Sequence, residues 1–344
     1  MVRIITVDDI GSLIRKVTIE KFFERLIEKT RECFNRWPEF HKIPRSVSHF
    51  DFGVIELMPI WNKDYYSVKY INGHPLNPQQ NKQTVVGIGM LADVATGYPV
   101  LISEMTLLTA LRTAATSALA SQYIARKNAK TMALIGTGAQ GEFQVIAHKA
   151  ALGIEKVKYF DIDPAAMKKF AANLAGYDIE LEACHDVQTA IREADIITTA
   201  TAAKKQAHIL KDAWINPGVA INALGGDCRG KTELDPNILH RSKIVVEFIE
   251  QTQEEGEIQN YAPEEVYAEL WQLTSGEKPG RVSDDELIVF DSVGFALEDY
   301  AVLRLVSSLA EDFHVGHMLD MVPDCKDPKD LFGLLNVTNN VVSA

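Results

Sequence analysis

A glycine-rich turn between an apolar run and a helical pattern constrains this chain more than any other stretch. Gly136-x-Gly138-x-x-Gly141 follows the apolar run Thr131–Ile135, and an acidic residue, Asp161, closes the next apolar run. In a βαβ unit the first glycine allows a tight turn, the second lets the backbone approach a pyrophosphate, and the third lets the helix pack against the strand. A carboxylate at the position of Asp161 binds ribose hydroxyls and repels a 2′-phosphate. The pattern therefore favours an NAD site over a purely structural glycine turn.

Size and charge limit the remaining possibilities. A chain of 344 residues is longer than a single hydrophobic core typically organises, so we expect two domains. The net charge of −12 argues against nucleic acid or an anionic membrane as a partner. The sequence has neither a run of about 18 apolar residues nor a signal-peptide pattern. The four cysteines are scattered without a CxxC pair, so we expect no metal site and a cytoplasmic protein with free thiols.

Hydrophobic periodicity divides the chain into two parts. Residues 18–37 and 104–127 have helical spacing, and the second stretch is rich in alanine with Arg112 in its middle. Between them lie short runs rich in Val, Ile, Tyr and Thr, separated by turn-prone pieces, which predict an antiparallel sheet. These runs are Val54–Met58, Tyr66–Tyr70, Thr84–Met90 and Tyr98–Ile102.

From residue 131 onwards the pattern alternates between strands and helices, as in a doubly wound parallel sheet. The predicted strands are Thr131–Ile135, Lys156–Phe160, Ile179–Ala183, Ile196–Ala200, Val219–Ala223, Ile244–Glu247 and Leu287–Phe290. A last helix, Leu297–Phe313, precedes an irregular tail that we expect to return to the first part. We therefore predict an α/β protein with a Rossmann-type domain at 126–314. Residues 1–125 and 315–344 are predicted to form an α+β substrate-binding and dimerisation domain.

Polar residues at the ends of the predicted strands are candidates for chemistry, because ligands of open α/β sheets bind there. Asp227 follows two glycines, Gly225 and Gly226, which leave room for ligands beside it. A carboxylate near a nicotinamide can move a proton to and from an amine. Asp227 can equally be a helix N-cap or a turn residue.

Three cations of the first part form a second candidate site. Arg45, Lys69 and Arg112 lie in or beside structured segments, and a buried cation needs a partner such as a substrate carboxylate. Alternatively, the three side chains reach solvent from half-buried elements. Glu56 alternates with apolar neighbours. It either protects an edge strand or accepts a ligand ammonium.

Several longer motifs resemble the ornithine cyclodeaminase/mu-crystallin family over nearly the whole chain. The most specific ones begin at Gly53, Lys69, Leu91, Thr109, Gly136, Gly225 and Asp291: GVIELMP, KYINGHP, LADVATGYPV, TALRTAAT, GTGAQ, GGDCRGKTEL and DSVGFALEDY. Together they are far more specific than the glycine turn alone.

The resemblance implies roles for individual residues. Arg45, Lys69 and Arg112 match positions that hold a substrate carboxylate, Asp227 matches the catalytic acid/base, and Val293 matches a substrate contact. The positions that match the NAD site are Thr84, Arg112, Ala139, Gln140, Asp161, Thr201, Leu224, Gly225, Gly226, Asp227, Lys231, Ser292 and, in the tail, Lys329. Family members are homodimers whose first-domain sheets join, and we expect the same here.

The implied reaction converts L-ornithine to L-proline and ammonia. NAD would take a hydride from Cα and return it later, so that no net oxidation occurs. We expect Glu56 to help hold the δ-ammonium, a role for which an alanine dehydrogenase has no use. The alternatives are a net oxidoreductase of the same family, such as an alanine dehydrogenase or a ketimine reductase, and a binding protein without activity. The sequence does not distinguish ornithine from lysine or from a shorter diamino acid as the substrate, because one methylene changes the binding free energy by only about 1–3 kcal/mol.

Overall fold

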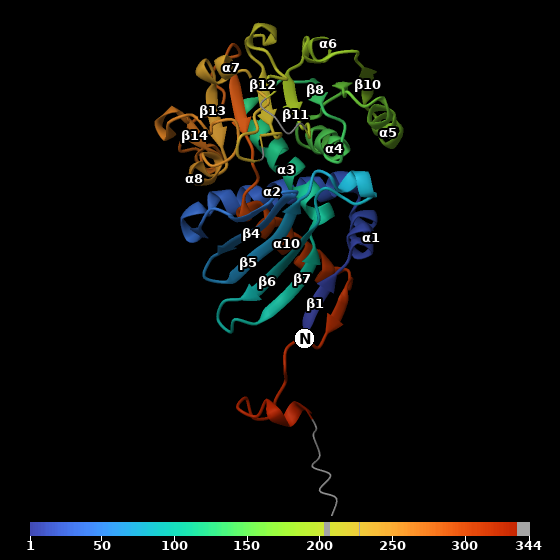
Figure 1. Cartoon of the computed structure of the whole chain (residues 1–344), viewed down its shortest axis with the longest axis vertical. Coiled ribbons are helices and arrows are strands. Elements are labelled where there is room, and N and C mark those ends of the chain that lie inside the picture. Colours follow the sequence, from blue (N-terminus) through green and yellow to red (C-terminus); the bar gives the residue numbers. More distant parts are fainter. Residues whose placement is uncertain (203–206, 227, 336–344) are drawn as a thin grey trace, which may run out of the picture.

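The computed structural model describes residues 1–202, 207–226 and 228–335. These residues form two eight-stranded sheets with a layer of helices between them (Figure 1). The predicted combination of a Rossmann-type sheet with an α+β part is confirmed. No helix in these described ranges is both long enough and apolar enough to cross a membrane.

The first sheet is mainly antiparallel. Its strand order is β16-β1-β7-β6-β5-β4-β2, and β3 also pairs with β4. The strands are β1 (Val2–Ile5), β2 (His41–Lys42), β3 (Ser46–Phe50), β4 (Gly53–Trp61), β5 (Tyr65–Gly73), β6 (Gly87–Asp93), β7 (Pro99–Glu104) and β16 (His317–Leu319). The antiparallel sheet predicted within residues 45–103 is confirmed, because β4, β5, β6 and β7 pair antiparallel. The strand β1, which was not predicted, runs parallel to β7. The run predicted from Thr84 becomes a strand only at Gly87.

The N-terminal elements were missed by the sequence analysis. β1 has only four residues, which is too short for a periodic signal. The helix α1 (Val7–Val17) begins with a capping box, in which Thr6 and Asp9 bind each other's backbone N–H groups. This Thr-x-x-Asp pattern was the available signal for the start of the helix.

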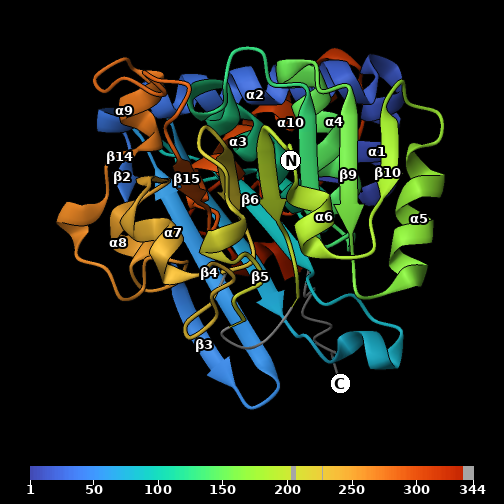
Figure 2. The same ribbon diagram turned by 90° about the horizontal axis from the view of Figure 1, so that it is seen from above.

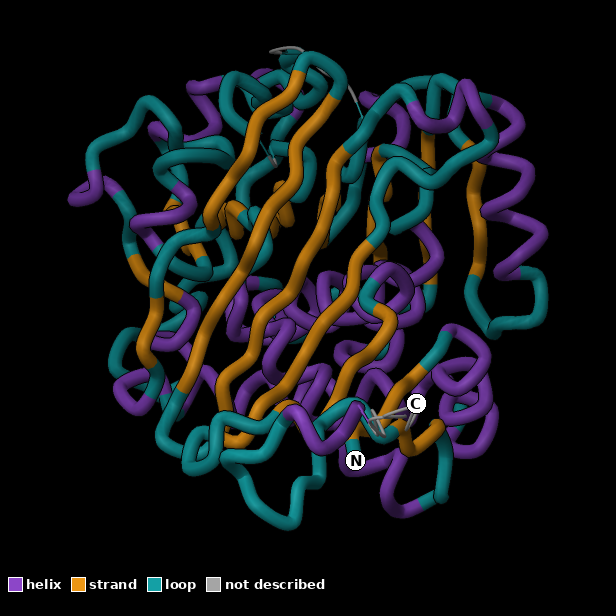
Figure 3. Tube along the Cα trace, turned by 60° about the horizontal axis from the view of Figure 1, so that its bottom comes forward, coloured by secondary structure: helices purple, strands orange, loops and turns teal. Residues whose placement is uncertain are grey.

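Alternation along the strands gives the first sheet two different faces. On β4, Glu56, Met58 and Ile60 are buried, whereas Leu57 between them is 47% exposed. The inner face packs against α10 (Ala296–Asp312), and α2 (Ile19–Asn35) packs on α10 in turn. Among the described residues, the other face carries no helix (Figure 3).

The helix α3 (Thr106–Ile124) lies between the two sheets and is buried nearly all round. Ala114, Ala115 and Ala118 are fully buried, and such small side chains allow neighbouring elements to approach closely. One hydrophobic core is continuous from the inner face of the first sheet to Met132, Leu134 and other residues on one face of the second sheet. Because α3 is part of this core, Arg112 is held rigidly at the boundary of the two sheets.

The second sheet is entirely parallel among the described residues, with the order β10-β9-β8-β11-β12-β15-β13-β14. Its strands are β8 (Thr131–Ile135), β9 (Lys156–Phe160), β10 (Glu180–Ala183), β11 (Ile196–Thr199), β12 (Ala220–Ala223), β13 (Lys243–Val246), β14 (Ala268–Glu269) and β15 (Ile288–Asp291). Each of the seven predicted strands is confirmed within one or two residues. The helices α4 (Gly141–Leu152), α5 (Pro164–Leu174), α6 (Val187–Ile191), α7 (Pro236–His240), α8 (Ile249–Thr252) and α9 (Leu270–Thr274) surround this sheet (Figure 2).

The strand order reverses at β8, since the chain moves outward to β9 and β10 and then returns to β11 on the other side. Parallel strands all end at the same edge of the sheet. The loops after β8, β11, β12 and β15 therefore emerge together, at the switch point where such sheets bind ligands.

The last part of the chain returns to the first sheet, as predicted. α10 lies within the range 126–314 that we assigned to the Rossmann-type domain, yet it packs against α2, α3 and the strands β4 to β6. β16 then pairs with β1. The division into domains remains a proposal, and α10 is the segment that joins its two parts.

Candidate functional site

The glycine turn has the backbone geometry that its pattern predicted. Gly136 has a φ of +98°, and a Cβ there would lie 2.6 Å from the carbonyl oxygen of Ala200. A Cβ at Gly141 would lie 3.2 Å from Phe170 Cδ2, whereas one at Gly138 would meet nothing within 4 Å. Gly136 and Gly141 are thus required by the turn and by helix packing. The space over Gly138 is open to a ligand at the N-terminus of α4.

Asp161 lies at the carboxyl end of β9 and is tied to the glycine turn. Its Oδ2 accepts hydrogen bonds from the backbone N of Thr137 at 2.6 Å and from the Thr137 hydroxyl at 3.2 Å. Gln140, at the N-cap of α4, has a buried Oε1 without a hydrogen-bond partner among the described atoms. The turn therefore presents a carboxylate and an unsatisfied amide oxygen beside an open surface.

The loops after β11 and β12 meet beside the glycine turn. The backbone N of Thr201 donates to Glu233 Oε1 at 3.2 Å, and Lys231 Nζ donates to the carbonyl oxygen of Thr201 at 3.2 Å. A Cβ at Gly225 would lie 1.9 Å from the Glu233 carboxyl carbon, so a side chain cannot be accommodated there. The predicted acid/base, Asp227, lies outside the described residues.

Glu247 organises the loop after β15. Its carboxylate accepts the Ser292 hydroxyl at 2.5 Å, the N–H of Val293 at 3.3 Å and the N–H of Gly294 at 3.2 Å. Leu224 and Ser292 are also fixed by backbone bonds, to Thr199 and Ala223 respectively. The predicted ligand residues of this loop are thus held rigidly.

The structure brings Arg45, Lys69 and Arg112 together, although they come from a loop, from β5 and from α3. Lys69 Nζ donates to Asp299 Oδ1 at 2.8 Å, and Arg112 Nε lies 3.1 Å from the same oxygen. Arg112 Nη1 donates to Glu298 Oε2 at 2.6 Å. The two cations thus share one pair of carboxylates at the start of α10.

Arg45 bridges the two sheets. Its Nη2 donates to the carbonyl oxygens of Val293 at 2.7 Å and of Gly294 at 2.5 Å, and its Nη1 lies 3.0 Å from Glu56 Oε2 and 3.4 Å from Glu255 Oε2. Its side chain is only 8% exposed. The reading in which the three cations reach solvent is therefore excluded, because Lys69 and Arg112 are 0% and 6% exposed as well.

Burial changes the protonation of this cluster. Removal from water, together with the nearby charge of Arg112, lowers the pKa of Lys69 to about 8. Burial also raises the pKa of Glu298. Removing one member of such a buried pair typically costs about 3–5 kcal/mol, because the other charge is left uncompensated. The cluster therefore holds elements of the two halves of the chain together and also forms a charged site.

Sequence reasoning missed the carboxylates that accompany the cations. Glu298 and Asp299 are fully buried in the first turn of α10, and Glu255 follows α8. For the first two, a signal existed, because two acidic residues interrupt the apolar face of a helix that is otherwise buried. Glu255 lies in an irregular loop, where no periodicity indicates burial.

Two predicted cofactor residues lie apart from this cluster in the described structure. Thr84 belongs to the loop between β5 and β6, where its carbonyl oxygen accepts the N–H of His74 at 2.8 Å. Lys329 is exposed in the tail, whose described part ends with η5 (Phe332–Leu335). This part of the tail lies below the first sheet in Figure 1, whereas the second sheet lies above it. The structure does not bring Lys329 to the other predicted residues of its own chain.

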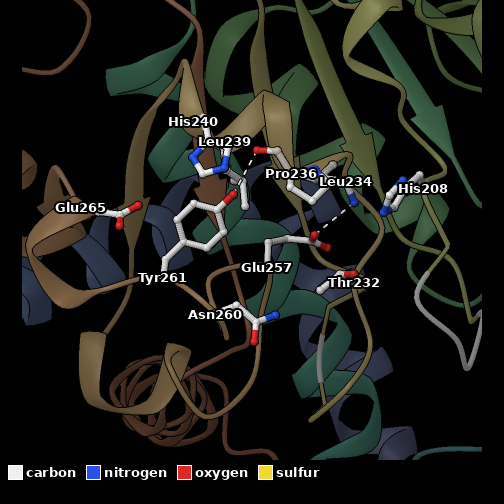
Figure 4. A pocket seen from close by; sticks show the side chains of 10 residues that line it. All are labelled: His208, Thr232, Leu234, Pro236, Leu239, His240, Glu257, Asn260, Tyr261 and Glu265. Carbon is white, nitrogen blue, oxygen red and sulfur yellow. Dashed lines mark hydrogen bonds between the residues drawn. The ribbon is translucent and has the colours of Figure 1, made fainter.

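A separate hollow of about 300 Å³ is lined by residues that include Thr232, Leu234 and Glu257 (Figure 4). Its buried acid is Glu257, which accepts the N–H groups of Glu233 at 2.7 Å and Leu234 at 3.0 Å. Burial raises the pKa of Glu257 to about 7. None of the predicted site residues lines this hollow. Glu257 supports the loop from behind, since a Cβ at Gly226 would lie 3.0 Å from its Oε1.

Comparison with protein families gives a match to the ornithine cyclodeaminase/mu-crystallin family over residues 8–313. One curated relative, named ornithine cyclodeaminase, comes from Agrobacterium tumefaciens (strain Ach5). It is 51% identical over 335 residues, which are 97% of this chain and 94% of the relative.

Solved structures with the same fold include enzymes of different activity. An archaeal alanine dehydrogenase dimer with bound NAD has a TM-score of 0.86 at 32% identity, covering 93% of this chain and 99% of that one. A lysine cyclodeaminase, studied for its recognition of L-lysine, L-ornithine and L-2,4-diaminobutyric acid, has a TM-score of 0.86 at 29% identity. This match covers 95% of the present chain and 98% of the lysine cyclodeaminase chain.

Proposed function

The chain belongs to the ornithine cyclodeaminase/mu-crystallin family, and on that basis we propose that it is an ornithine cyclodeaminase. It converts L-ornithine to L-proline and ammonia, with NAD as cofactor. The observation that carries the proposal is the buried cluster of Arg45, Lys69 and Arg112 with a carboxylate, Glu56, beside it. Such a site matches an amino acid that has a carboxylate at one end and an extra ammonium at the other.

The residues around the glycine turn fit NAD. The open face over Gly138 allows a pyrophosphate to approach, and Gln140 has an amide oxygen that still needs a partner. Asp161 is held beside this turn by its hydrogen bond from Thr137, and a carboxylate there would bind ribose hydroxyls and repel a 2′-phosphate. We propose that Thr201, Lys231 and Ser292 complete the site from the neighbouring loops. When bound, NAD would supply reversible hydride transfer, so that Cα of ornithine loses a hydride and the same carbon regains it after ring closure and loss of ammonia, which gives proline.

The protein's own residues would bind and orient the substrate. We propose that Arg45, Lys69 and Arg112 hold the ornithine carboxylate and thereby fix Cα, which is catalysis by proximity. Val293 forms part of the same wall, since its carbonyl oxygen accepts the Arg45 guanidinium. Asp227 would take a proton from an amine and later assist the departure of ammonia. The two preceding residues in the sequence, Gly225 and Gly226, pack directly on the carboxylates of Glu233 and Glu257.

Glu56 distinguishes a diamino acid from a simple amino acid. It lies on the inner face of β4 and is 8% exposed, so its charge must be matched inside the protein. Arg45 is its partner in the described structure. When a substrate carboxylate takes part of the charge of Arg45, the δ-ammonium of ornithine can compensate Glu56. Alanine offers no such group.

The activity is tested by supplying L-ornithine with a trace of NAD. We expect proline and ammonia to form in equal amounts and to exceed the NAD many times over, because the cofactor is regenerated in each cycle. Proline and ammonia are measured by amino-acid analysis, and NADH by its absorbance. L-Lysine is run in parallel to compare chain lengths.

A net oxidoreductase is the alternative, given the 32% identity to the archaeal alanine dehydrogenase. In that case NADH would accumulate in proportion to product, and proline would not exceed the supplied NAD. That result would rule out the cyclodeaminase. The absence of any turnover with intact NAD binding would favour a binding protein.

Lys69 predicts a pH dependence of substrate binding. Because its pKa in the folded protein is about 8, the ammonium is charged below that pH and loses its charge above it. We expect the dissociation constant of L-norvaline, which has the ornithine carbon chain without the distal amine, to be flat from pH 6 to pH 7.5. Above pH 8 it should rise by up to about tenfold per unit.

The matched variant for this measurement is Lys69→Met. It should bind L-norvaline more weakly than the wild type below pH 8 and lack the rise above pH 8, so that the two dissociation constants approach each other at high pH. Binding is measured by calorimetry on the NADH-loaded protein. A rise of the same size in Lys69→Met would show that another group titrates.

We further propose that two chains form a homodimer through the uncovered face of the first sheet. Leu57, Tyr70 and Ile88 are paired in one row across β4, β5 and β6, and their exposures are 47%, 41% and 54%. Apolar rows of this kind on an open sheet face are typical of interaction sites. A second copy would cover them.

The dimer is tested by light scattering of the wild type and of Ile88→Asp. We expect twice the chain mass of 38.2 kDa for the wild type and the single mass for the variant, because a buried unpaired charge opposes association. Val282→Asp is the control, since Val282 is 66% exposed and lies in the other half of the chain. An unchanged dimer in Ile88→Asp would place the interface elsewhere.

A further inference from the structure

A buried amide from the second half of the chain binds the backbone of Arg45. Gln251 lies on α8 and is 2% exposed. Its Oε1 accepts the backbone N–H of Arg45 at 3.1 Å, and its Nε2 donates to the carbonyl oxygen of Gly294 at 2.6 Å. An amide side chain has an acceptor end and a donor end. Both ends of Gln251 are therefore used, and they join two loops that are far apart in the sequence.

The carbonyl oxygen of Gly294 also binds the far end of Arg45. Arg45 Nη2 donates to this oxygen at 2.5 Å, so the backbone and the guanidinium of Arg45 are both tied to the loop after β15. Arg45 lies in the connection of residues 43–45 between β2 and β3, which has no regular secondary structure. Gln251 thus fixes the point from which the Arg45 side chain extends, at a place where the local backbone does not.

Gly294 contacts Arg112 as well as Arg45. It has a φ of +77°, and a Cβ at this position would lie 2.4 Å from Arg112 Nη1. Gly294 therefore lies against both guanidinium groups, with its carbonyl oxygen bonded to one and its Cα packed on the other. The hydrogen bond from Gln251 acts on the residue that sets how these two cations lie relative to each other.

Aromatic packing holds the short helix that carries Gln251. Phe248, at the N-cap of α8, lies 4.9 Å from Phe295 between ring centroids. Trp37, which begins η1 (Trp37–Glu39) in the first half of the chain, lies 6.0 Å and 5.8 Å from these two rings. All three rings are buried, and such pairs add to the stabilisation that burial gives. Gln251 is therefore presented to Arg45 from a firmly packed support.

We propose that Gln251 is a positioning residue, which holds Arg45 in the orientation that binds the substrate carboxylate. The inference rests on the proposed function, since Arg45 is one of the residues assigned to that carboxylate. Arg45 Nε is buried and has no hydrogen-bond partner among the described atoms, so it remains available to the substrate. Nε is the guanidinium nitrogen nearest the backbone, and its place depends most on the backbone bond to Gln251.

The test measures the binding of L-norvaline to the NADH-loaded protein through the fluorescence of NADH. Gln251→Met removes both hydrogen bonds and keeps a similar side-chain volume. We expect the dissociation constant of L-norvaline to rise about tenfold in this variant, as for the loss of buried hydrogen bonds that orient a binding group. The affinity for NADH should change by less than about twofold, because Glu247 still binds the Ser292 hydroxyl.

A double-mutant cycle with Arg45→Met separates positioning from a general structural role. Lys69 and Arg112 still bind the carboxylate in Arg45→Met, so the affinity for L-norvaline remains measurable. Adding Gln251→Met to this variant should raise the dissociation constant by less than about twofold, because the group that Gln251 positions is gone.

The matched control is Gln253→Met, which makes the same change two residues further along the chain. The Gln253 amide donates to the carbonyl oxygen of Tyr261 at 3.4 Å. The affinities for L-norvaline and NADH should both stay at wild-type values in this variant. Circular dichroism checks that each variant is folded.

Two results would overturn the inference. Unchanged affinity for L-norvaline in Gln251→Met would mean that Arg45 keeps its position without the amide. A loss of the same size in the Arg45→Met background would mean that Gln251 supports the whole site and does not act through Arg45. Proline formation from L-ornithine by the wild type is a separate readout. Its absence contradicts the proposed function, whereas the binding ratios test Gln251 alone.

Discussion

A buried network of ion pairs at the boundary of the two sheets determines how this protein is built. Arg45, Lys69 and Arg112 come from three different elements, and each is buried only because carboxylates from elsewhere in the chain reach it. Charges of this kind are costly to bury and costly to break once paired. The central helices α3 and α10 hold the network in place, and their small or apolar side chains belong to one core that spans both sheets.

The same network is in direct contact with the loops that we propose bind the nucleotide. The loop after β15 contributes carbonyl oxygens to Arg45 and is held by Glu247, so the cation cluster and the edge of the second sheet share a wall. A glycine turn alone would suit any NAD enzyme. Next to a buried cation cluster with the carboxylate of Glu56 beside it, it suits an enzyme whose substrate carries a carboxylate and an additional ammonium. This combination, and not the turn, points to cyclisation of a diamino acid.

Local patterns were sufficient to predict the strands and helices of the second sheet in their order along the chain. Each apolar run and each glycine determines the conformation of only the residues next to it. They also located Lys69 and Arg112 inside structured segments. The carboxylates that pair with these cations could not be predicted from the sequence. Asp299 is 230 positions from Lys69 and Glu298 is 186 positions from Arg112, and no periodicity connects residues at such distances. The pairing of β1 with β7 was hidden for the same reason, since a four-residue strand has meaning only beside its distant partner.

The central claim is that the hydride taken from ornithine stays in the site until it is returned. It is tested most directly with L-ornithine that carries deuterium at Cα, incubated with unlabelled NAD and followed by mass spectrometry of proline. The account predicts that the deuterium is retained at Cα of proline, also when unlabelled NADH is added in excess. Loss of the deuterium to the free NADH or to water would contradict it.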